Sequence, residues 1–116
     1  MNPIIYGISN CDSVKKARRW LETQDIEYTF VDVRQTLPTA ELLGEWIAAV
    51  GPDKLVNRRS TTWKNLPEQQ RQAVIDGEVL PVLLDNPTLI KRPVLVHRGD
   101  TVVGFTPSDY DQRFNH

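Results

Sequence analysis

The residue best suited to chemistry in this chain is Cys11, the single cysteine of the sequence. It follows Ser9-Asn10, directly after a short apolar run, and a helical pattern begins beside it. Since asparagine is a favoured helix N-cap, we expect Asn10 to cap a helix whose first turn holds Cys11. Unpaired backbone N–H groups and the positive end of the helix dipole meet there, and both favour the nucleophilic thiolate form of cysteine.

Two charged neighbours of Cys11 have opposite effects on a thiolate. Lys15 lies four residues on, on the same helical face, where its ammonium would favour the negative charge. Asp12 would oppose it, because a neighbouring carboxylate disfavours a second negative charge. A lone cysteine is also commonly a small buried hydrophobe. The residues alone therefore leave both a nucleophilic and a packing role open for Cys11.

Other kinds of site have little support in the composition. One cysteine cannot form an internal disulfide or a thiolate-rich zinc site, and His97 and His116 do not approach a metal-ligand spacing. The formal net charge is -1, with acidic and basic residues mixed along the chain, so the basic stripe of a general nucleic-acid binder is missing. We therefore expect no metal, no bound cofactor and no direct nucleic-acid binding.

The length and hydropathy pattern indicate one domain without a membrane span. A chain of 116 residues has the size of a single domain with one core. No apolar run approaches the roughly 20 residues that a membrane-spanning helix needs. The N-terminus lacks the charged, apolar and small-residue regions of a signal peptide. We therefore expect a cytoplasmic protein.

The first 36 residues predict a strand, a helix and a second strand. The apolar run from Ile4 to Ile8 is typical of a buried strand. Val14, Ala17 and Leu21 then recur at helical spacing. The segment from Glu27 to Val33 has the aromatic and β-branched residues of a second strand. Together these elements make a βαβ unit, whose crossover should be right-handed.

The middle of the chain, residues 37–89, predicts helices instead. An apolar face repeats at helical spacing from Leu42 to Val50, and Gly51-Pro52 ends it. Two further helices are expected, one from Pro67 to Gly77 and a short one from Leu80 to Asp85.

The last part of the chain returns to strands. Val94 to Val96 and Thr101 to Phe105 each predict a strand, and Gly99-Asp100 between them suits a two-residue hairpin turn. Thr106 to Asp109 then begins a final helix with a capping threonine, a proline and an acidic first turn.

The order of these elements predicts one α/β domain over residues 1–116, with a thioredoxin-like fold. Its core would be a mixed four-stranded sheet with flanking helices, built from residues 1–36 and 90–116. Residues 37–89 would be a helical insertion between the two halves of the sheet. Ligands of α/β sheets usually bind at strand-to-helix junctions. The fold therefore favours the nucleophilic role for Cys11.

Three stretches carry distinctive motifs in a fixed order. Residues 5–17 place Asn-Cys-Asp between a strand and a helix, residues 57–66 form a basic segment, and residues 90–96 lead from Lys-Arg-Pro into a strand. They resemble the active-site segment, the insertion loop and the arginine-proline motif of the arsenate reductase (ArsC)-like and Spx-like proteins. The resemblance spans nearly the full chain and is best for the small YffB-type branch.

The resemblance implies roles for individual residues. Cys11 would be the catalytic cysteine, and Arg92 would bind an anion beside it. The Arg92-Pro93 peptide bond would be cis, which proline tolerates at little cost. By residue type alone, Arg92 would be a solvated loop arginine. We also expect a set of residues to contact the substrate or glutathione, with the choice between the two neighbouring arginines left open: Asn10, Lys15, Arg58, Arg59 and Pro93.

The sequence departs from the family pattern at three positions. Gly104 stands where arsenate reductases carry a third arginine, Asn57 where they place the insertion arginine, and Val14 where many Spx-like regulators have a second cysteine. These departures put arsenate reduction in doubt and exclude an internal disulfide switch.

We therefore expect a thiol-dependent reductase with one nucleophilic cysteine. It would form a mixed disulfide with an external thiol, for which glutathione or another small thiol is the expected co-substrate and glutaredoxin a further candidate partner. Two alternatives remain open. One is an arsenate reductase that uses glutathione and glutaredoxin, and the other is an Spx-like regulatory protein that binds RNA polymerase.

Overall fold

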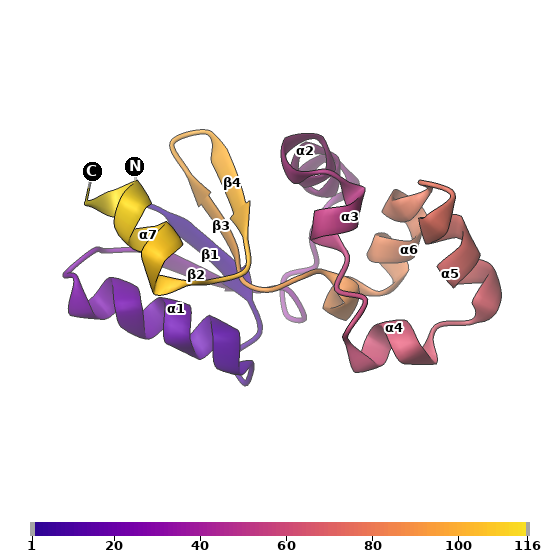
Figure 1. The fold of residues 1–116 in the computed structure, drawn as a ribbon, viewed down its shortest axis with the longest axis horizontal. Coiled ribbons are helices and arrows are strands. Elements are labelled where there is room, and N and C mark those ends of the chain that lie inside the picture. Colours follow the sequence, from indigo (N-terminus) through magenta and orange to yellow (C-terminus); the bar gives the residue numbers. More distant parts are fainter. Residues whose placement is uncertain (1, 116) are drawn as a thin grey trace.

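A four-stranded mixed sheet forms one half of the molecule in the computed structural model, which describes residues 2–115 (Figure 1). The strands are β1 (Ile4–Gly7), β2 (Thr29–Asp32), β3 (Val94–His97) and β4 (Asp100–Val103). Their order in the sheet is β2-β1-β3-β4. β1 pairs with β2 in parallel, whereas the β1–β3 and β3–β4 pairs are antiparallel. The predicted α/β fold with a mixed four-stranded sheet is confirmed.

Helices cover both faces of this sheet. α1 (Asp12–Thr23) and α7 (Pro107–Phe114) lie on one face, and the helices of the middle segment lie beyond the other (Figure 1). The middle segment comprises α2 (Ala40–Val50), α3 (Pro52–Leu55), α4 (Thr61–Asn65), α5 (Glu68–Ile75), α6 (Val79–Asp85) and the 3₁₀ turn η1 (Pro87–Leu89). No helix among residues 2–115 is long and apolar enough to cross a membrane.

The alternation of side chains along the strands produces two separate cores. Ile5 and Leu95 point to one face and pack with Val14 and Tyr110 of the flanking helices. Their neighbours Tyr6 and Val94 belong to the other face, where they pack against the middle helices. The central strands β1 and β3 therefore join both halves of the molecule.

Aromatic packing closes the seam between the sheet and the middle helices. The rings of Tyr6 in β1 and Trp46 in α2 meet edge to face, with centroids 4.8 Å apart. Trp46 is 1% exposed and is one of the largest fully buried side chains of the molecule. The sheet and the helical segment are thus held by apolar contacts as well as by the chain connections.

The β3–β4 hairpin turns one residue earlier than expected. His97 pairs with Asp100, so the two loop residues are Arg98 and Gly99, and not Gly99-Asp100. Both have a positive φ, 52° and 82°. Type I′ hairpin turns need positive φ at both central positions, and glycine is favoured at the second one. The position of Gly99 in that turn type sets the register.

Short helical turns replace expected loops in the middle segment. α3, α4 and η1 were not predicted, because segments of three to five residues carry too little apolar periodicity. α4 lies in the expected basic loop, where the Ser60 hydroxyl accepts a hydrogen bond from the Trp63 N–H at 3.0 Å.

Candidate active site

Cys11 lies at the N-cap of α1 and is half-buried. Asn10 was expected to be the cap, and this expectation was wrong. Ser9 and Asn10 form a turn in which the Cys11 N–H donates to the Ile8 carbonyl at 3.2 Å. Cys11 keeps an extended backbone, and its carbonyl accepts the first helical hydrogen bond, from the Lys15 N–H, at 2.9 Å. Cys11 is therefore the residue that directly precedes the unpaired N–H groups of the first turn.

Three chain segments meet at the edge of the sheet where this turn begins. Gly7 ends β1 and pairs with Asp32, the last residue of β2. The antiparallel strand β3 begins there, since Tyr6 pairs with Val94. Pro93 comes just before Val94 and is buried. The Cys11 turn, the end of β2 and the Arg92-Pro93 segment consequently share one edge.

Asp32 ties the end of β2 to the turn before Cys11. Its carboxylate is 8% exposed and accepts a hydrogen bond from the Arg34 N–H at 2.9 Å. Hydrogen bonds from the backbone N–H groups of Arg34 and Ser9, together with the Arg34 guanidinium, hold the pKa of Asp32 below its usual value. The Arg34 guanidinium in turn donates to the Asn10 side-chain oxygen at 3.3 Å. The Asn10 amide thus takes part in holding the turn.

This Asp32–Arg34–Asn10 network was missed by the sequence analysis. Asp32 and Arg34 lie more than twenty residues from Asn10, so only the parallel pairing of β1 and β2 brings them together. The available signal was Asp32, an acidic residue near the end of the second predicted strand. In a parallel pair, this end lies next to the junction between the first strand and its helix. Carboxyl ends of parallel neighbours meet at one edge.

Asp32→Asn is expected to lower the free energy of unfolding at neutral pH, because a neutral amide replaces a carboxylate that accepts backbone N–H groups. The folded-state pKa of Asp32 is depressed, so its contribution is present above about pH 4 and is lost as the pH falls through the folded-state value. Urea unfolding of both proteins at about pH 7 and pH 2.5 measures this. The difference should shrink at the lower pH.

A matched control for this prediction is Asp85→Asn, at the end of α6. Asp85 is exposed and its carboxylate makes no hydrogen bond or ion pair within residues 2–115. The role assigned to the Asp32 carboxylate would be contradicted if Asp32→Asn lowered the free energy of unfolding no more than Asp85→Asn does. It would also be contradicted if the loss were equal at both pH values.

Arg92 is half-buried and anchored by one end of its guanidinium. Its Nη1 donates to the Thr88 carbonyl at 2.6 Å. Its Nε is buried and has no hydrogen-bond partner among the described residues. The Arg92-Pro93 peptide bond is cis, as the resemblance implied. The Nη2 group of Arg92 makes no hydrogen bond with another described residue and is the donor left for an anion.

The basic segment lies beside the chain that enters Arg92. Val56 forms an isolated antiparallel bridge with Ile90. The Asn57 N–H donates to the Leu89 carbonyl at 2.9 Å, and the Lys91 N–H donates to the Leu55 carbonyl at 2.7 Å. The structure thus brings the expected basic segment and Arg92 together. No hydrogen bond within residues 2–115 links either of them to the Cys11 thiol.

The two neighbouring arginines of the basic segment differ in their surroundings. Arg58 stacks over the Trp63 ring at 5.3 Å and forms an ion pair with Asp53 at 3.6 Å. Arg59 is exposed, and its guanidinium makes no hydrogen bond or ion pair with the rest of the described chain. Arg59 is therefore the one of the two with free donors.

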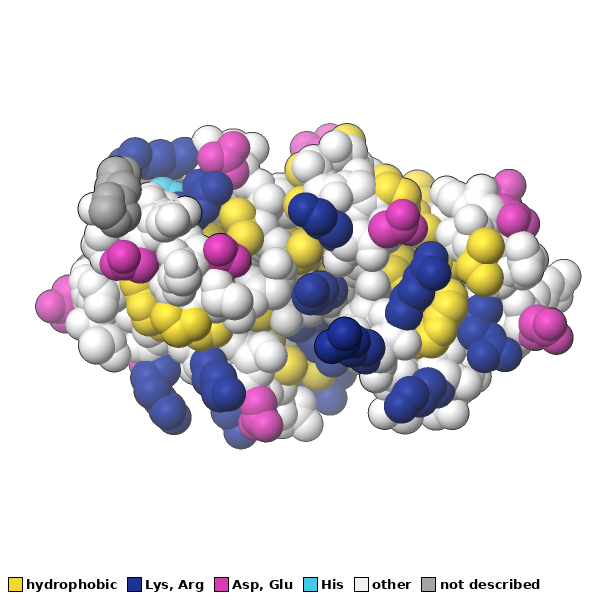
Figure 2. Space-filling view, viewed as in Figure 1, with side chains coloured by type: hydrophobic (Ala, Val, Ile, Leu, Met, Phe, Trp, Pro, Cys, Tyr) yellow, Lys and Arg dark blue, Asp and Glu magenta, His cyan; other side chains and the backbone are white. Residues whose placement is uncertain are grey.

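Two lysines complete the positive charge of this region. Lys15 is exposed on α1 and makes no ion pair with any described residue. Lys91, which the sequence analysis did not single out, lies against Gly104, with its Cε 3.3 Å from the place where a Cβ would sit. Figure 2 shows Lys and Arg side chains gathered across the middle of this face, where the sheet and the helical segment meet. The arrangement suits a small ligand with carboxylate groups.

Comparisons with known proteins agree with this architecture. The sequence model of the ArsC family matches residues 6–113. The solved structure of a YffB protein superimposes with a TM-score of 0.90, at 37% identity over 96% of this chain and 97% of that one. An arsenate reductase (ArsC) related protein from Brucella melitensis gives a TM-score of 0.77, at 41% identity over 100% and 97%. The regulatory protein MgsR of Bacillus subtilis is 31% identical over 90% of this chain and 83% of its own length.

Proposed function

This chain belongs to the ArsC family, and we propose that it is a thiol-dependent reductase in which Cys11 forms a mixed disulfide with glutathione. One observation carries the proposal. Cys11 is a free, half-buried thiol at the N-cap of α1, in a chain with no second cysteine. A single thiol of this kind needs another thiol from solution to complete a reduction. Glutathione fits because it carries two carboxylates and the region around the site is rich in cations.

The proposed reaction has two thiol–disulfide exchanges. The Cys11 thiolate attacks the glutathione sulfur of a glutathionylated substrate, so that a Cys11–glutathione bond forms and the substrate leaves as a thiolate, which takes a proton from water. The thiolate of a second glutathione then attacks the glutathione sulfur of this mixed disulfide. Oxidised glutathione leaves and the Cys11 thiolate is restored. The net reaction converts one glutathionylated substrate and one reduced glutathione into the free substrate thiol and oxidised glutathione, so reduced glutathione is the reductant and Cys11 is regenerated.

Mass spectrometry of the intact protein tests this chemistry directly. After exposure to oxidised glutathione, we expect one glutathione adduct per chain, located on Cys11 by peptide mapping and removed by excess reduced glutathione. A small thiol that lacks carboxylates, offered as its disulfide, serves as the comparison and should react more slowly. Absence of an adduct on a folded, reduced chain would overturn the proposal.

Arg59, whose guanidinium has no partner among the described residues, is proposed to hold a carboxylate of glutathione, together with Arg92. Arg59→Gln is expected to raise the KM for glutathione about tenfold, because a charge-assisted hydrogen bond contributes about 1.5–3 kcal/mol. The matched control is Arg58→Gln, whose side chain is already engaged by Trp63 and Asp53, and which should change the KM much less. Steady-state kinetics with varied glutathione measure both. Equal effects, or a larger one for Arg58→Gln, would contradict the assignment.

Arsenate reduction is a second candidate, favoured by the 41% identity to the arsenate reductase related protein of Brucella melitensis. Lys91 supplies a cation beside Gly104, although no arginine stands there. Arsenate-dependent oxidation of NADPH, coupled through glutathione, glutaredoxin and glutathione reductase, would support it if Cys11→Ser removed the turnover. No turnover above the protein-free rate would exclude it.

A regulatory role is a third candidate, favoured by the 31% identity to MgsR. In this case the fold would dock on a transcription partner such as RNA polymerase, with glutathione chemistry absent or secondary. Mixing the purified chain with purified polymerase tests this by co-elution in gel filtration. Co-elution without any glutathione adduct at Cys11 would favour the regulatory role over the reductase.

A further inference from the structure

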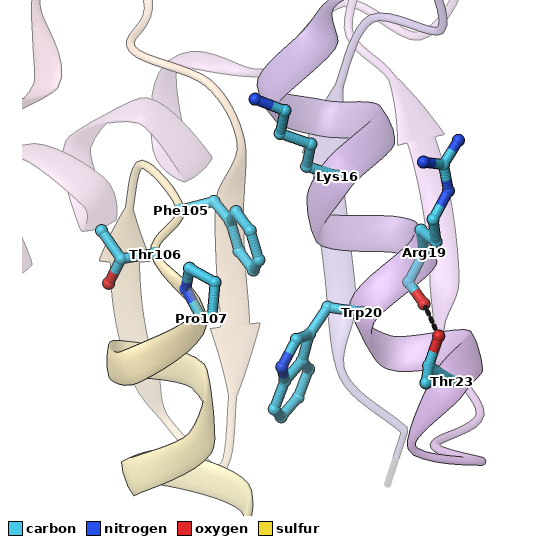
Figure 3. A pocket seen from close by; sticks show the side chains of 7 residues that line it. All are labelled: Lys16, Arg19, Trp20, Thr23, Phe105, Thr106 and Pro107. Atoms are coloured by element: carbon cyan, nitrogen blue, oxygen red, sulfur yellow. Dashed lines mark hydrogen bonds between the residues drawn. The ribbon is translucent and has the colours of Figure 1, made fainter.

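An apolar groove lies between α1 and the connection from β4 to α7 (Figure 3). Its volume is about 510 Å³. Trp20 of α1 forms one wall, and Phe105 and Pro107 form the other (Figure 3). Trp20 and Phe105 are both partly exposed. Partly exposed aromatic rings in a concave site are typical of surfaces that receive a partner's side chain.

The walls of this groove are held in place by the core beneath it. Tyr110 is 1% exposed and contacts both walls edge to face, with its ring 5.7 Å from that of Trp20 and 4.7 Å from that of Phe105. Phe114 supports Trp20 from the end of α7, at 6.0 Å. The groove is therefore formed before any partner arrives, which lowers the ordering cost of binding.

Two unpaired cations belong to the lining of the groove. Lys16 lies four residues before Trp20 and shares its face of α1, whereas the Arg19 side chain points to the other side of the helix in Figure 3. Both are exposed, and neither makes an ion pair with any residue from 2 to 115. An apolar slot with free positive charge at its border is complementary to an apolar side chain flanked by carboxylates.

We infer that this groove is a docking site for a protein segment in which a bulky apolar residue, preferably aromatic, is flanked by Asp or Glu. A volume of about 510 Å³ accommodates one or two large side chains, which favours a peptide segment over the broad contact that a membrane surface makes. Two cations in a chain of net charge -1 are too few for a nucleic-acid backbone. The occupant is a protein partner.

The position of the groove relates this partner to Cys11. Trp20 lies nine residues after Cys11 along α1, a rise of about 13 Å. A segment anchored in the groove can therefore extend along α1 and place one of its own residues near the thiol. The groove would select protein partners of Cys11 by their sequence. The docking inference itself does not require the reductase proposal.

Peptide binding to the Cys11→Ser chain tests the inference without thiol chemistry. The probe is a synthetic heptapeptide with a central phenylalanine and three acidic residues on each side. Two comparison peptides replace the phenylalanine with alanine, or the acids with lysines. Binding is followed by NMR through the indole N–H signals, where Trp20 should shift and the buried Trp46 should not.

Charge reversal in the groove supplies the decisive variant. Lys16→Glu combined with Arg19→Glu is expected to weaken binding of the acidic peptide about tenfold or more. The matched control, Lys54→Glu with Lys64→Glu, changes the same net charge at exposed positions of α3 and α4 and should alter the affinity less than twofold. Equal loss in both variants would show a general charge effect and overturn the inference.

Three other results would also overturn the inference. The first is that the acidic peptide shifts no Trp20 signal. The second is that the lysine peptide binds as tightly as the acidic peptide. The third is that the acidic peptide does not bind, whereas anionic phospholipid vesicles or a single-stranded oligonucleotide do. Because the Cys11→Ser chain is used, such a failure leaves the glutathione proposal standing. Conversely, peptide binding persists if Cys11 proves to have no redox role.

Discussion

Cys11→Ser is expected to abolish glutathione-dependent disulfide reduction, with a fall in rate of about a thousandfold or more. The serine hydroxyl is a poor nucleophile at neutral pH and forms no disulfide. The chain offers no second cysteine that could take over. Steady-state turnover of a glutathionylated peptide, measured with glutathione reductase and NADPH, gives the rate. The adduct with oxidised glutathione should disappear from the mass spectrum at the same time.

The fold should survive this change, which makes the loss interpretable. The Cys11 thiol makes no capping hydrogen bond, and its side chain is only partly buried. Serine is a preferred N-cap residue, so it can hold the first turn of α1 at least as well. The control is Ser13→Ala, an exposed change in the same turn that should leave the rate nearly unaltered. Turnover retained by a well-folded Cys11→Ser chain would place the chemistry elsewhere.

Periodicity was enough to predict the fold, because the buried faces of the main elements are regular. Val14, Ala17 and Leu21 are all fully buried on α1, at the spacing that predicted the helix. The expected cap of α7 is present, with Thr106 accepting from the Asp109 N–H. Local signals of this kind are contained within one element and do not depend on distant partners.

The details of the site depend on contacts between distant segments, which one sequence does not display. The choice of Cys11 as N-cap follows from the Ser9-Asn10 turn, and that turn is fixed by Asp32 and Arg34 from the far end of β2. The difference between the two arginines of the basic segment likewise arises from the folding of α4, which brings a tryptophan ring under one of them. The motif resemblance located these segments but could not rank their residues.

The surroundings of Cys11 combine a turn held by hydrogen bonds with cations that have no partner among residues 2–115. The β1–β2 side carries a hydrogen-bonded carboxylate with little exposure, which fixes the turn that presents Cys11. Arg59 of the basic segment and Lys15 of α1 are exposed and make no ion pair within residues 2–115. A thiol on a turn held by hydrogen bonds, with unpaired cations elsewhere on the surface, is compatible with the proposed reaction with a small anionic thiol.

Gly7→Ala is expected to destabilise the fold by about 1–3 kcal/mol and to slow the reaction of Cys11. A Cβ at position 7 would lie 2.6 Å from one methyl group of Val14 and 3.0 Å from the other. Val14 is fully buried and stiff at χ1, so it cannot turn away. The first turn of α1 must therefore move away from β1, and Cys11 moves with it. Urea unfolding and the rate of the glutathione adduct measure the two effects.

Gly44→Ala in α2 is the matched control for this steric argument. A Cβ at Gly44 would meet nothing within 4 Å, and alanine in a helix interior is better than glycine by about 0.5–1 kcal/mol. We therefore expect the control to stabilise the chain slightly. Adding Val14→Ala to Gly7→Ala should cost less than the sum of the two single changes, because the smaller side chain makes room for the new methyl group. We explain the glycine at position 7 by the close packing of α1 on β1. This explanation would be contradicted if the losses in free energy of unfolding of Gly7→Ala and Val14→Ala simply added, or if the Gly7→Ala chain were as stable as the control.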